Sequence, residues 1–209
     1  MKLKRLLSLA VTSAAIGLGA SAAQAAVIID GSTQGYYNAG LGNIIPVVGD
    51  PLVTPIAPEP NLGSVANLGT WLTNAAPSGG TWSATPVAIP STWTVGDETA
   101  IVYAINAGSG LSNVHIDLGV DNGIYVWLNG PYLFGAMAPG GSTPGEYGID
   151  VASLAGGTHY LQILRADHGG STGYSIQMTA DRAAVPEPAA LALLGIGLAG
   201  LGWMRRRAG

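Results

Sequence analysis

The sequence predicts an all-β fold, and three observations carry that prediction. Hydrophobic and polar residues alternate over 114–121, which gives a strand one buried and one solvated face. Residues 124–128 alternate in the same way and end at Asn129-Gly130, a dipeptide that favours a tight hairpin turn. Between the two ends of the chain, no stretch combines helical periodicity with capping residues. We therefore expect one β-sandwich domain between two targeting segments.

The first of these segments, residues 1–25, is predicted to be a signal peptide. Basic residues precede an apolar run over 6–20, and the small-residue stretch Ala23-Gln24-Ala25 follows it. This order is typical of a secretory signal peptide, and we place the cleavage between Ala25 and Ala26. The alternative is an uncleaved N-terminal anchor helix, which the short apolar run and the fitting cleavage site disfavour.

Residues 26–69 are rich in proline and glycine and predict an irregular arm with at most short strands. A short strand fits 27–29, whereas the five prolines between 46 and 60 exclude a central strand in the later part. We expect this arm to lie over a sheet. The tripeptide Pro58-Glu59-Pro60 also occurs at 186–188, but no apolar run follows it here, so we interpret it as a chance match.

Residues 70–184 are predicted to form the sandwich. Three Thr-Trp pairs recur at an interval that fits short strands separated by turns. Further strands are expected at 99–107, 132–134, 147–151, 159–166 and 173–180.

Within this region, three segments resemble galactose-binding-like jelly rolls, including lectin-like sandwiches of the protective-antigen type. Residues 120–130 read Val-Asp-Asn-Gly-Ile-Tyr-Val-Trp-Leu-Asn-Gly, which is similar to the central hairpin of those domains. Residues 154–163 resemble their segment of leucine, turn, glycine and long strand, and 173–180 resemble the closing strand. The resemblance implies a jelly-roll-type β-sandwich, an architecture shared by accessory modules of enzymes, adhesins and structural domains.

The last segment, residues 185–209, has three parts in a fixed order. Pro186-Glu187-Pro188 comes first, an apolar stretch over 189–204 follows, and Arg205, Arg206 and Arg207 end it. As a helix, the apolar stretch rises about 1.5 Å per residue and falls a little short of the ~30 Å hydrocarbon core of a bilayer. We expect a transmembrane helix over 189–204 with its arginines on the cytoplasmic side.

This order resembles the PEP-CTERM sorting signal of Gram-negative bacteria that make exopolysaccharide. The resemblance implies that an exosortase-type membrane protease cuts near the Pro-Glu-Pro. Signal peptidase and the secretion machinery are the other partners that the two ends imply. We expect an exported protein that is anchored in the inner membrane before processing and then reaches the cell surface or the extracellular matrix.

The chain between these ends is strongly acidic. It holds eleven of the twelve acidic residues but only two of the eight basic ones, Arg165 and Arg182. Such a surface repels phosphate backbones, so nucleic acid is not an expected partner, whereas divalent cations are attracted. The chain has no cysteine, so the exported domain must depend on its core rather than on disulfides.

Aromatic and amide side chains make a candidate sugar-binding set. Aromatic rings stack on the apolar faces of sugar rings, while amides and carboxylates bind the hydroxyls. Tyr125, Trp127 and Asn129 share one face of their strand. The remaining candidates are the tryptophans of the three Thr-Trp pairs, Trp71, Trp82 and Trp93. The alternative is that these rings serve the core, as large aromatic residues usually do.

A candidate calcium site consists of Asp117, Asp121 and Asn122, whose oxygens lie near a strand end and its turn. In sandwiches of the protective-antigen type, an adjacent Asp pair at this turn holds Ca²⁺, which in turn binds sugar; here the second position is Asn122. The alternative is a solvated turn that the side chains cap. Calcium is thus the one cofactor that the sequence suggests.

Two strings that look enzymatic do not fit their surroundings. Gly169-x-Ser171-x-Gly173 matches a nucleophile elbow, which requires a strand-to-helix turn in an α/β sheet rather than a link between two β-strands. A Gly-x-Gly-x-x-Gly string starts at Gly195 inside the expected tail helix, with no strand before it. We therefore expect a protein that is not an enzyme.

The sequence-based functional hypothesis is a noncatalytic surface or matrix protein that binds or organises exopolysaccharide. A second hypothesis is a structural matrix or adhesion protein without a defined glycan, whose acidic surface is bridged by calcium. A third is a secreted glycan hydrolase, which requires two carboxylates about 5–9.5 Å apart across a cleft.

Overall fold

The computed structural model describes residues 24–45, 57–138, 141–167, 169–182, 195, 196 and 198. Residues Ala23–Ala183 form one compact unit. In its described part there are nine strands and one short 3-10 helix: β1 (Gln24–Ile29), β2 (Gln34–Gly42), η1 (Ala66–Leu68), β3 (Val87–Ala88), β4 (Glu98–Asn106), β5 (Gly110–Leu128), β6 (Tyr132–Ala138), β7 (Tyr147–Ala155), β8 (Thr158–Ala166) and β9 (Gly173–Arg182). The predicted all-β fold is confirmed.

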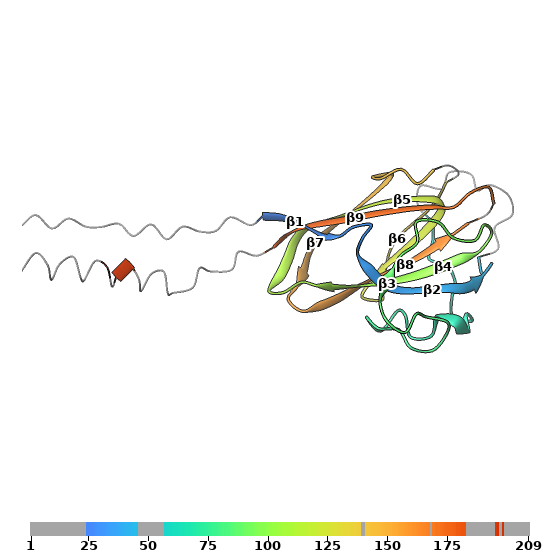
Figure 1. The fold of residues 1–209 in the computed structure, drawn as a ribbon, viewed down its shortest axis with the longest axis horizontal. Helices are drawn as coiled ribbons and strands as arrows, with labels where there is room; N and C mark the ends of the chain where they lie inside the picture. Colours follow the sequence, from blue (N-terminus) through green and yellow to red (C-terminus); the bar gives the residue numbers. More distant parts are fainter. Residues whose placement is uncertain are drawn as a thin grey trace, which may run out of the picture. The chain divides into compact units, whose positions relative to one another are not determined.

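The nine strands form one curled, antiparallel sheet whose two halves face each other (Figure 1). The half that we call sheet 1 has the order β1-β9-β5-β7. The half that we call sheet 2 has the order β6-β5-β8-β4-β2-β3. Strand β5 belongs to both, because residues up to Asp121 pair with β7 and β9 and later residues pair with β6 and β8. This is the jelly-roll-like sandwich that the sequence predicts.

The first core lies between the two sheets and is largely aliphatic. From sheet 1 it receives alternate residues of β5, β7 and β9, and from sheet 2 it receives one face of β4, β8 and the end of β5. Its fully buried members include Ile101, Ile105, Ile116, Leu118, Ile124, Leu161 and Ile163. Burying each such side chain contributes about 1.5–3 kcal/mol, so this core is the main source of stability in a domain without cysteine.

A second core lies on the other face of sheet 2. Residues 57–82, which we call the cover segment, pack there and bury Trp71 and Leu68 against Tyr125 and Trp127 of β5. In Figure 1 the cover segment (teal) lies beside β2, away from β9. Sheet 2 is therefore buried on both faces, which explains why β4 and β8 carry continuous apolar runs rather than simple alternation.

The outer face of sheet 1 is polar, and we call it the open face. It presents the exposed or half-buried side chains of His115, Asp117, Asp150, Gln177 and Thr179. Their apolar neighbours in β5 point the other way into the first core. The alternation over 114–121 thus predicted the right two faces for this part of β5.

The region 26–69 differs from the predicted irregular arm. It contains the nine-residue strand β2, which pairs with β4 and β3, and most of β1, which pairs with β9. Residues 34–42 hold no proline, and their tyrosines pack against both cores, so a paired strand is accommodated there. Residue 70 is not a domain boundary either, since the cover segment runs across it.

The three Thr-Trp pairs do not mark three strands. Trp71 lies in a turn, Trp82 forms an isolated bridge to Asn38, and Trp93 lies in a loop. The hairpin predicted at 129–130 is present between β5 and β6. Asn129 and Gly130 have φ values of 56° and 95°, the positive pair that a tight turn of this kind requires.

Candidate functional site

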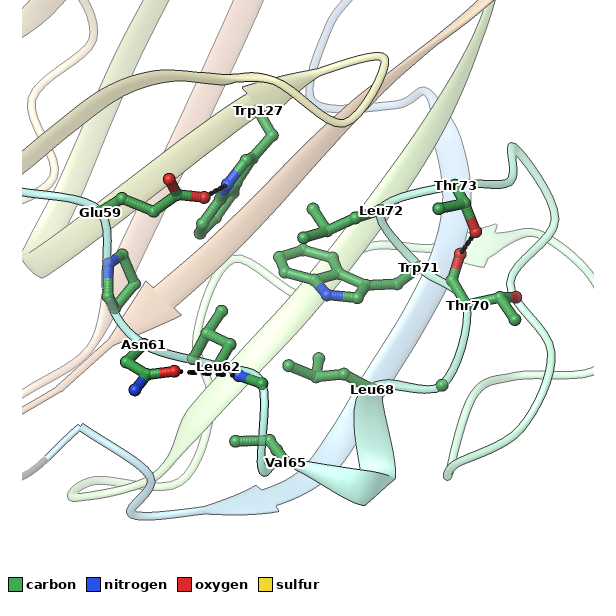
Figure 2. Close-up of a pocket in the computed structure, with 13 residues that line it drawn as sticks. Glu59, Asn61, Leu62, Val65, Leu68, Thr70, Trp71, Leu72, Thr73 and Trp127 are labelled. Atoms are coloured by element: carbon green, nitrogen blue, oxygen red, sulfur yellow. Dashed lines mark hydrogen bonds between the residues drawn. The ribbon is translucent and has the colours of Figure 1, made fainter.

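A pocket of about 550 Å³ opens between the cover segment and sheet 2. Twelve of its thirteen lining residues come from 59–73, and Trp127 of β5 completes it. Figure 2 shows Glu59 beside Trp127 at one end, Thr70 and Thr73 at the other, and the Trp71 ring among Leu62, Leu68 and Leu72. The pocket thus combines an apolar floor with polar groups at two ends.

The start of the cover segment is fastened to strand β6. The Ala57 N–H donates to the Gly135 carbonyl at 2.7 Å, and the Tyr132 hydroxyl donates to the Ala57 carbonyl at 2.6 Å. Two prolines follow at 58 and 60, each with a fixed φ. Together these contacts restrict the position of Glu59, which stands between the prolines.

The later part of the cover segment is fastened to strand β2 through the buried side chain of Asn38. Its amide nitrogen donates to the Asn67 carbonyl at 2.7 Å, and its amide oxygen accepts from the Thr81 hydroxyl at 2.7 Å. Gly80 has a φ of +81°, and a Cβ there would overlap the Asn67 carbonyl, so glycine permits this approach. The pocket wall is therefore held by hydrogen bonds distant in sequence.

Aromatic rings form the layer under the pocket. The rings of Trp71 and Trp127 meet edge to face with centroids 5.0 Å apart, and Tyr132 meets Trp127 at 5.4 Å. Trp82 stacks on Trp71 at 6.3 Å and donates from Nε1 to the Leu68 carbonyl at 3.0 Å. Such pairs add about 0.5–1.5 kcal/mol beyond their buried area, which makes this a rigid support.

Among the described residues that line the pocket, Glu59 is the one that carries a charge. Its Oε1 accepts the Nε1–H of Trp127 at 2.7 Å, so the indole of a fully buried residue fixes an exposed carboxylate. No second hydrogen bond or ion pair of this carboxylate involves another residue that the structure describes. The carboxylate can therefore accept a hydrogen bond from a ligand.

The remaining polar groups of the pocket are neutral. The Asn61 amide oxygen accepts the Gly63 N–H at 3.3 Å, which leaves the amide nitrogen as a donor. The Thr73 hydroxyl donates to the Thr70 carbonyl at 3.0 Å and accepts from the Asn74 amide at 3.3 Å, which leaves one acceptor lone pair. An apolar patch, amide and hydroxyl groups, and one carboxylate are the groups with which proteins hold a sugar ring.

Four of the six predicted sugar-binding residues come together in the second core. Trp71 and Trp127 line the pocket, while Trp82 and Tyr125 pack in the same cluster without lining it. Trp127 is 0% exposed, and Trp71 and Tyr125 are each 3% exposed. These three rings are packed into the second core, because Trp71 of the cover segment lies against Tyr125 and Trp127 on the second apolar face of β5.

The other two predicted residues lie elsewhere. Trp93 covers the guanidinium of Arg165, whose Cζ is 4.3 Å from the ring centroid, and Arg165 is fully buried with Tyr37 and Tyr174 also nearby. Asn129 holds the β5–β6 turn, because its Oδ1 accepts the Tyr160 N–H at 3.0 Å. Both side chains have structural roles in these contacts.

The three predicted calcium ligands are not brought together. Asp117 contacts His115 on the open face, whereas Asp121 is buried and accepts from Ser171 at 2.8 Å and from the neighbouring Asn122 at 2.9 Å. Four residues of one strand span about 13 Å, too far for Asp117 and Asp121 to share one ion. The described residues contain no group of three or more acidic, histidine or cysteine side chains that could hold a metal.

Two titratable groups, Glu98 in the interior and His115 on the open face, have pKa values that are raised for different reasons. Burial raises the pKa of Glu98 to about 7, although the carboxylate accepts the N–H groups of Ile44 and Ile45. On the open face, hydrogen bonds to Asp150 first and then to Asp117 raise the pKa of His115. The pKa of Glu98 is thus raised by desolvation, and the pKa of His115 is raised by hydrogen bonds to carboxylates.

Glu59, Asn61 and Asn38 were not among the predicted site residues. Glu59 stands between two prolines, which restrict the backbone on both sides of it, and this was the available signal. Asn38 becomes recognisable only once Asn67 and Thr81 are known to lie beside it.

The predicted sorting residues Pro186, Glu187, Pro188 and Arg205–Arg207 lie outside the described residues. Of the predicted helix over 189–204, Gly195, Ile196 and Leu198 are described, and they are helical. Among the described residues, no helix has the length and apolar character that a membrane span needs. The predicted cleavage residues Ala25 and Ala26 lie in β1, where they pair with Asp181 and Ala180.

Comparisons with known proteins give one match at the C-terminus and one weak likeness of fold. None of the curated proteins matches the chain. A β-glucuronidase of Faecalibacterium prausnitzii is similar in structure, with 14% identity and a TM-score of 0.41. The likeness covers 78% of this chain and 32% of the β-glucuronidase. Residues 184–207 match the PEP-CTERM protein-sorting motif, so this is an exported protein that an exosortase, a membrane protease, processes at its C-terminal end.

Proposed function

We propose that this exported protein is a noncatalytic component of the cell surface or extracellular matrix that binds exopolysaccharide. The pocket between the cover segment and sheet 2 would be its glycan site. The carrying observation is that this pocket joins an apolar floor to an amide, hydroxyl groups and one oriented carboxylate. Ligand pockets of proteins are typically concave and apolar with a few placed polar groups.

The chemistry of the pocket supports binding rather than hydrolysis. Glycoside hydrolysis by the usual route needs two carboxyl groups facing each other across the scissile bond. Among the described residues that line the pocket, Glu59 is the single carboxylate, and it is engaged by the Trp127 N–H. One carboxylate serves recognition and does not supply the acid and nucleophile pair.

The export route supports the proposed location. The sorting motif sends each copy of the protein along the same export route, and we propose that several copies lie along one polysaccharide. Weak single-site binding then gains strength by multivalency, because linked sites raise the effective concentration of each other's ligand. A shallow, partly open pocket is sufficient under these conditions.

The test is to fill the pocket without removing any of its contacts. Gly63 lines the pocket, and a Cβ there would meet only the Asn61 amide oxygen, at 3.5 Å. We expect Gly63→Trp to abolish co-sedimentation of the full chain with the producer's own exopolysaccharide. Gly141→Trp is the matched control, since Gly141 is exposed outside the pocket and a Cβ there meets nothing within 4 Å.

Retention of the polysaccharide by the Gly63→Trp protein would overturn the pocket as the site. Absence of binding by the unmodified protein would overturn the proposed function and favour a structural matrix protein without a glycan ligand. Hydrolysis of the polysaccharide, detected as new reducing ends, would overturn the noncatalytic assignment.

A further inference from the structure

We propose that the pocket selects a glycan with a protonated amine, such as a polymer of glucosamine that is not fully acetylated. This inference rests on the proposed function and adds the charge class of the sugar. It follows from three features of the described part of the pocket: the charge of Glu59, the way that residue is held, and the scarcity of positive charge around it.

The charge at the pocket is negative and accessible. Glu59 is exposed, and the lining residues that the structure describes include no basic side chain. In the described part of the chain, the only Lys or Arg residues are Arg165, which is fully buried, and Arg182, at the end of β9. At the described part of the pocket, a sulfated or uronic acid polymer would therefore meet like charge and no cation to pair with it.

The carboxylate of Glu59 is held in place before any ligand arrives. Trp127 is fully buried, so its indole cannot move freely, and its Nε1–H holds Oε1 at 2.7 Å. Prolines on both sides of Glu59 restrict its backbone. Binding therefore loses little conformational entropy at this side chain, and an ammonium group gains a charge-assisted hydrogen bond at the remaining oxygen.

The same features discriminate between an amine and its acetylated form. Acetylation leaves the sugar ring and its hydroxyls in place but removes the positive charge and adds a bulkier amide. Because hydrogen bonds to charged groups contribute about 1.5–3 kcal/mol, loss of the ammonium should weaken binding by roughly tenfold or more. The apolar floor and the neutral polar groups would still accept the ring of a neutral sugar.

The experiment uses the full chain purified in detergent and isothermal titration calorimetry with three oligosaccharides of matched length. These are oligomers of glucosamine, of N-acetylglucosamine and of galacturonic acid. We expect the glucosamine oligomer to bind at least about tenfold more tightly than the acetylated one. We expect its affinity to fall with added salt, and the uronate to show no measurable binding.

Glu59→Gln separates the charge of this side chain from its structural contact. The Gln amide oxygen can still accept the Trp127 N–H, so the thermal unfolding midpoint should stay near that of the unmodified protein. The preference for the glucosamine oligomer over the acetylated one should disappear. Asp150→Asn, which removes an exposed carboxylate on the open face, is the matched control and should leave the preference unchanged.

The possible results distinguish this inference from the proposed function. Equal affinity for the amino and acetylated oligomers would overturn the amine selectivity, with glycan binding intact. A preference that Asp150→Asn reduces as much as Glu59→Gln does would assign it to the overall negative charge and overturn the pocket. If all three oligomers and the producer's own polysaccharide failed to bind, the proposed function itself would fail.

Discussion

The two outer faces of this sandwich share strand β5 but differ in what lies on them. On sheet 1 the odd-numbered residues His115 and Asp117 reach solvent on the open face. On sheet 2 the odd-numbered residues Tyr125 and Trp127 are buried under the cover segment. Strand β5 therefore passes from sheet 1, whose outer face is exposed to solvent, to sheet 2, whose two faces are both buried.

The difference shows how each pocket of this fold is built. On the open face, a pocket of about 470 Å³ lies beside Asp117 and Gln177, where the loop with Pro144 and Gly145 adjoins the sheet. On the covered face, a nonregular segment laid over the sheet leaves a pocket where it does not pack fully. The pocket beside Trp71 and Glu59 arises in that way. Four predictions test the contrast between the covered and the open face, in order of decreasing effect.

The largest effect is expected for Trp127→Ala on the covered face. The substitution removes a fully buried indole that contacts Trp71 and Tyr132, so we expect a loss of about 3–5 kcal/mol in the free energy of unfolding. Urea denaturation monitored by circular dichroism measures it. The matched change on the open face, Gln177→Ala, should stay within about 0.5 kcal/mol. Similar losses for the two variants would contradict the contrast.

The second prediction concerns Glu98, which lies at the start of β4. Its pKa rises from about 4.5 in the unfolded chain to about 7 in the folded protein, so the folded state binds the proton more tightly. Its contribution to stability is therefore complete below pH 4.5 and is lost as the pH rises through 7. We expect a loss of about 1–3 kcal/mol over this window.

Denaturation curves at a series of pH values check the Glu98 prediction. In Glu98→Gln the side chain does not titrate, so the slope between pH 4.5 and 7 should be reduced. An unchanged slope in that variant would assign the pH dependence to another group.

A smaller effect is expected for Tyr132→Phe. The change removes the hydroxyl that donates to the Ala57 carbonyl at 2.6 Å and fastens the cover segment to β6. We expect a loss of about 0.5–1.5 kcal/mol, together with faster amide hydrogen exchange near the start of the cover segment. Tyr36→Phe is the control, because no hydrogen bond joins the Tyr36 hydroxyl to another described side chain. Equal exchange rates in the two variants would argue against this attachment.

The smallest effect on stability is expected for His115 on the open face. Asp150 and then Asp117 raise its pKa above about 6.5, so its contribution is present below that pH and is lost as the pH rises through the raised value. Because the pair is exposed and screened by salt, the effect on stability should be slight. A titration followed by NMR should show the imidazole pKa fall in Asp150→Asn, and an unchanged pKa would exclude this pairing.

The sequence could predict a structural feature when the residues that form it are close together in the chain. The alternation over 114–121 and 124–128, the two faces of these stretches and the turn at 129–130 follow from local patterns, and the structure agrees with them. The turn expected at Asp121-Asn122 is wrong, because β5 continues through these residues as one strand. The C-terminal sorting motif was also recognisable, because its three parts are contiguous. These are features that a short window of sequence defines by itself.

The candidate site could not be predicted in the same way. The aromatic residues of β5 were expected to bury one face and offer the other to sugar, because alternation does not show that a cover segment lies on the second face. Glu59 gains its role only through Trp127, which is 68 residues away in the chain. The nine-residue strand β2 was missed because the prolines that follow it dominated the composition of the region.

The placement of β9 has a mechanical consequence for a protein held through its C-terminal end. β9 pairs with β5 along most of its length and with β1 near its end, and the sorting motif follows it within two residues of Arg182. Antiparallel hydrogen bonds lie perpendicular to the strands, so tension along β9 would load both ladders in shear. Many bonds must then yield together instead of opening one after another. A domain tethered in this way would resist being torn from its attachment by flowing liquid.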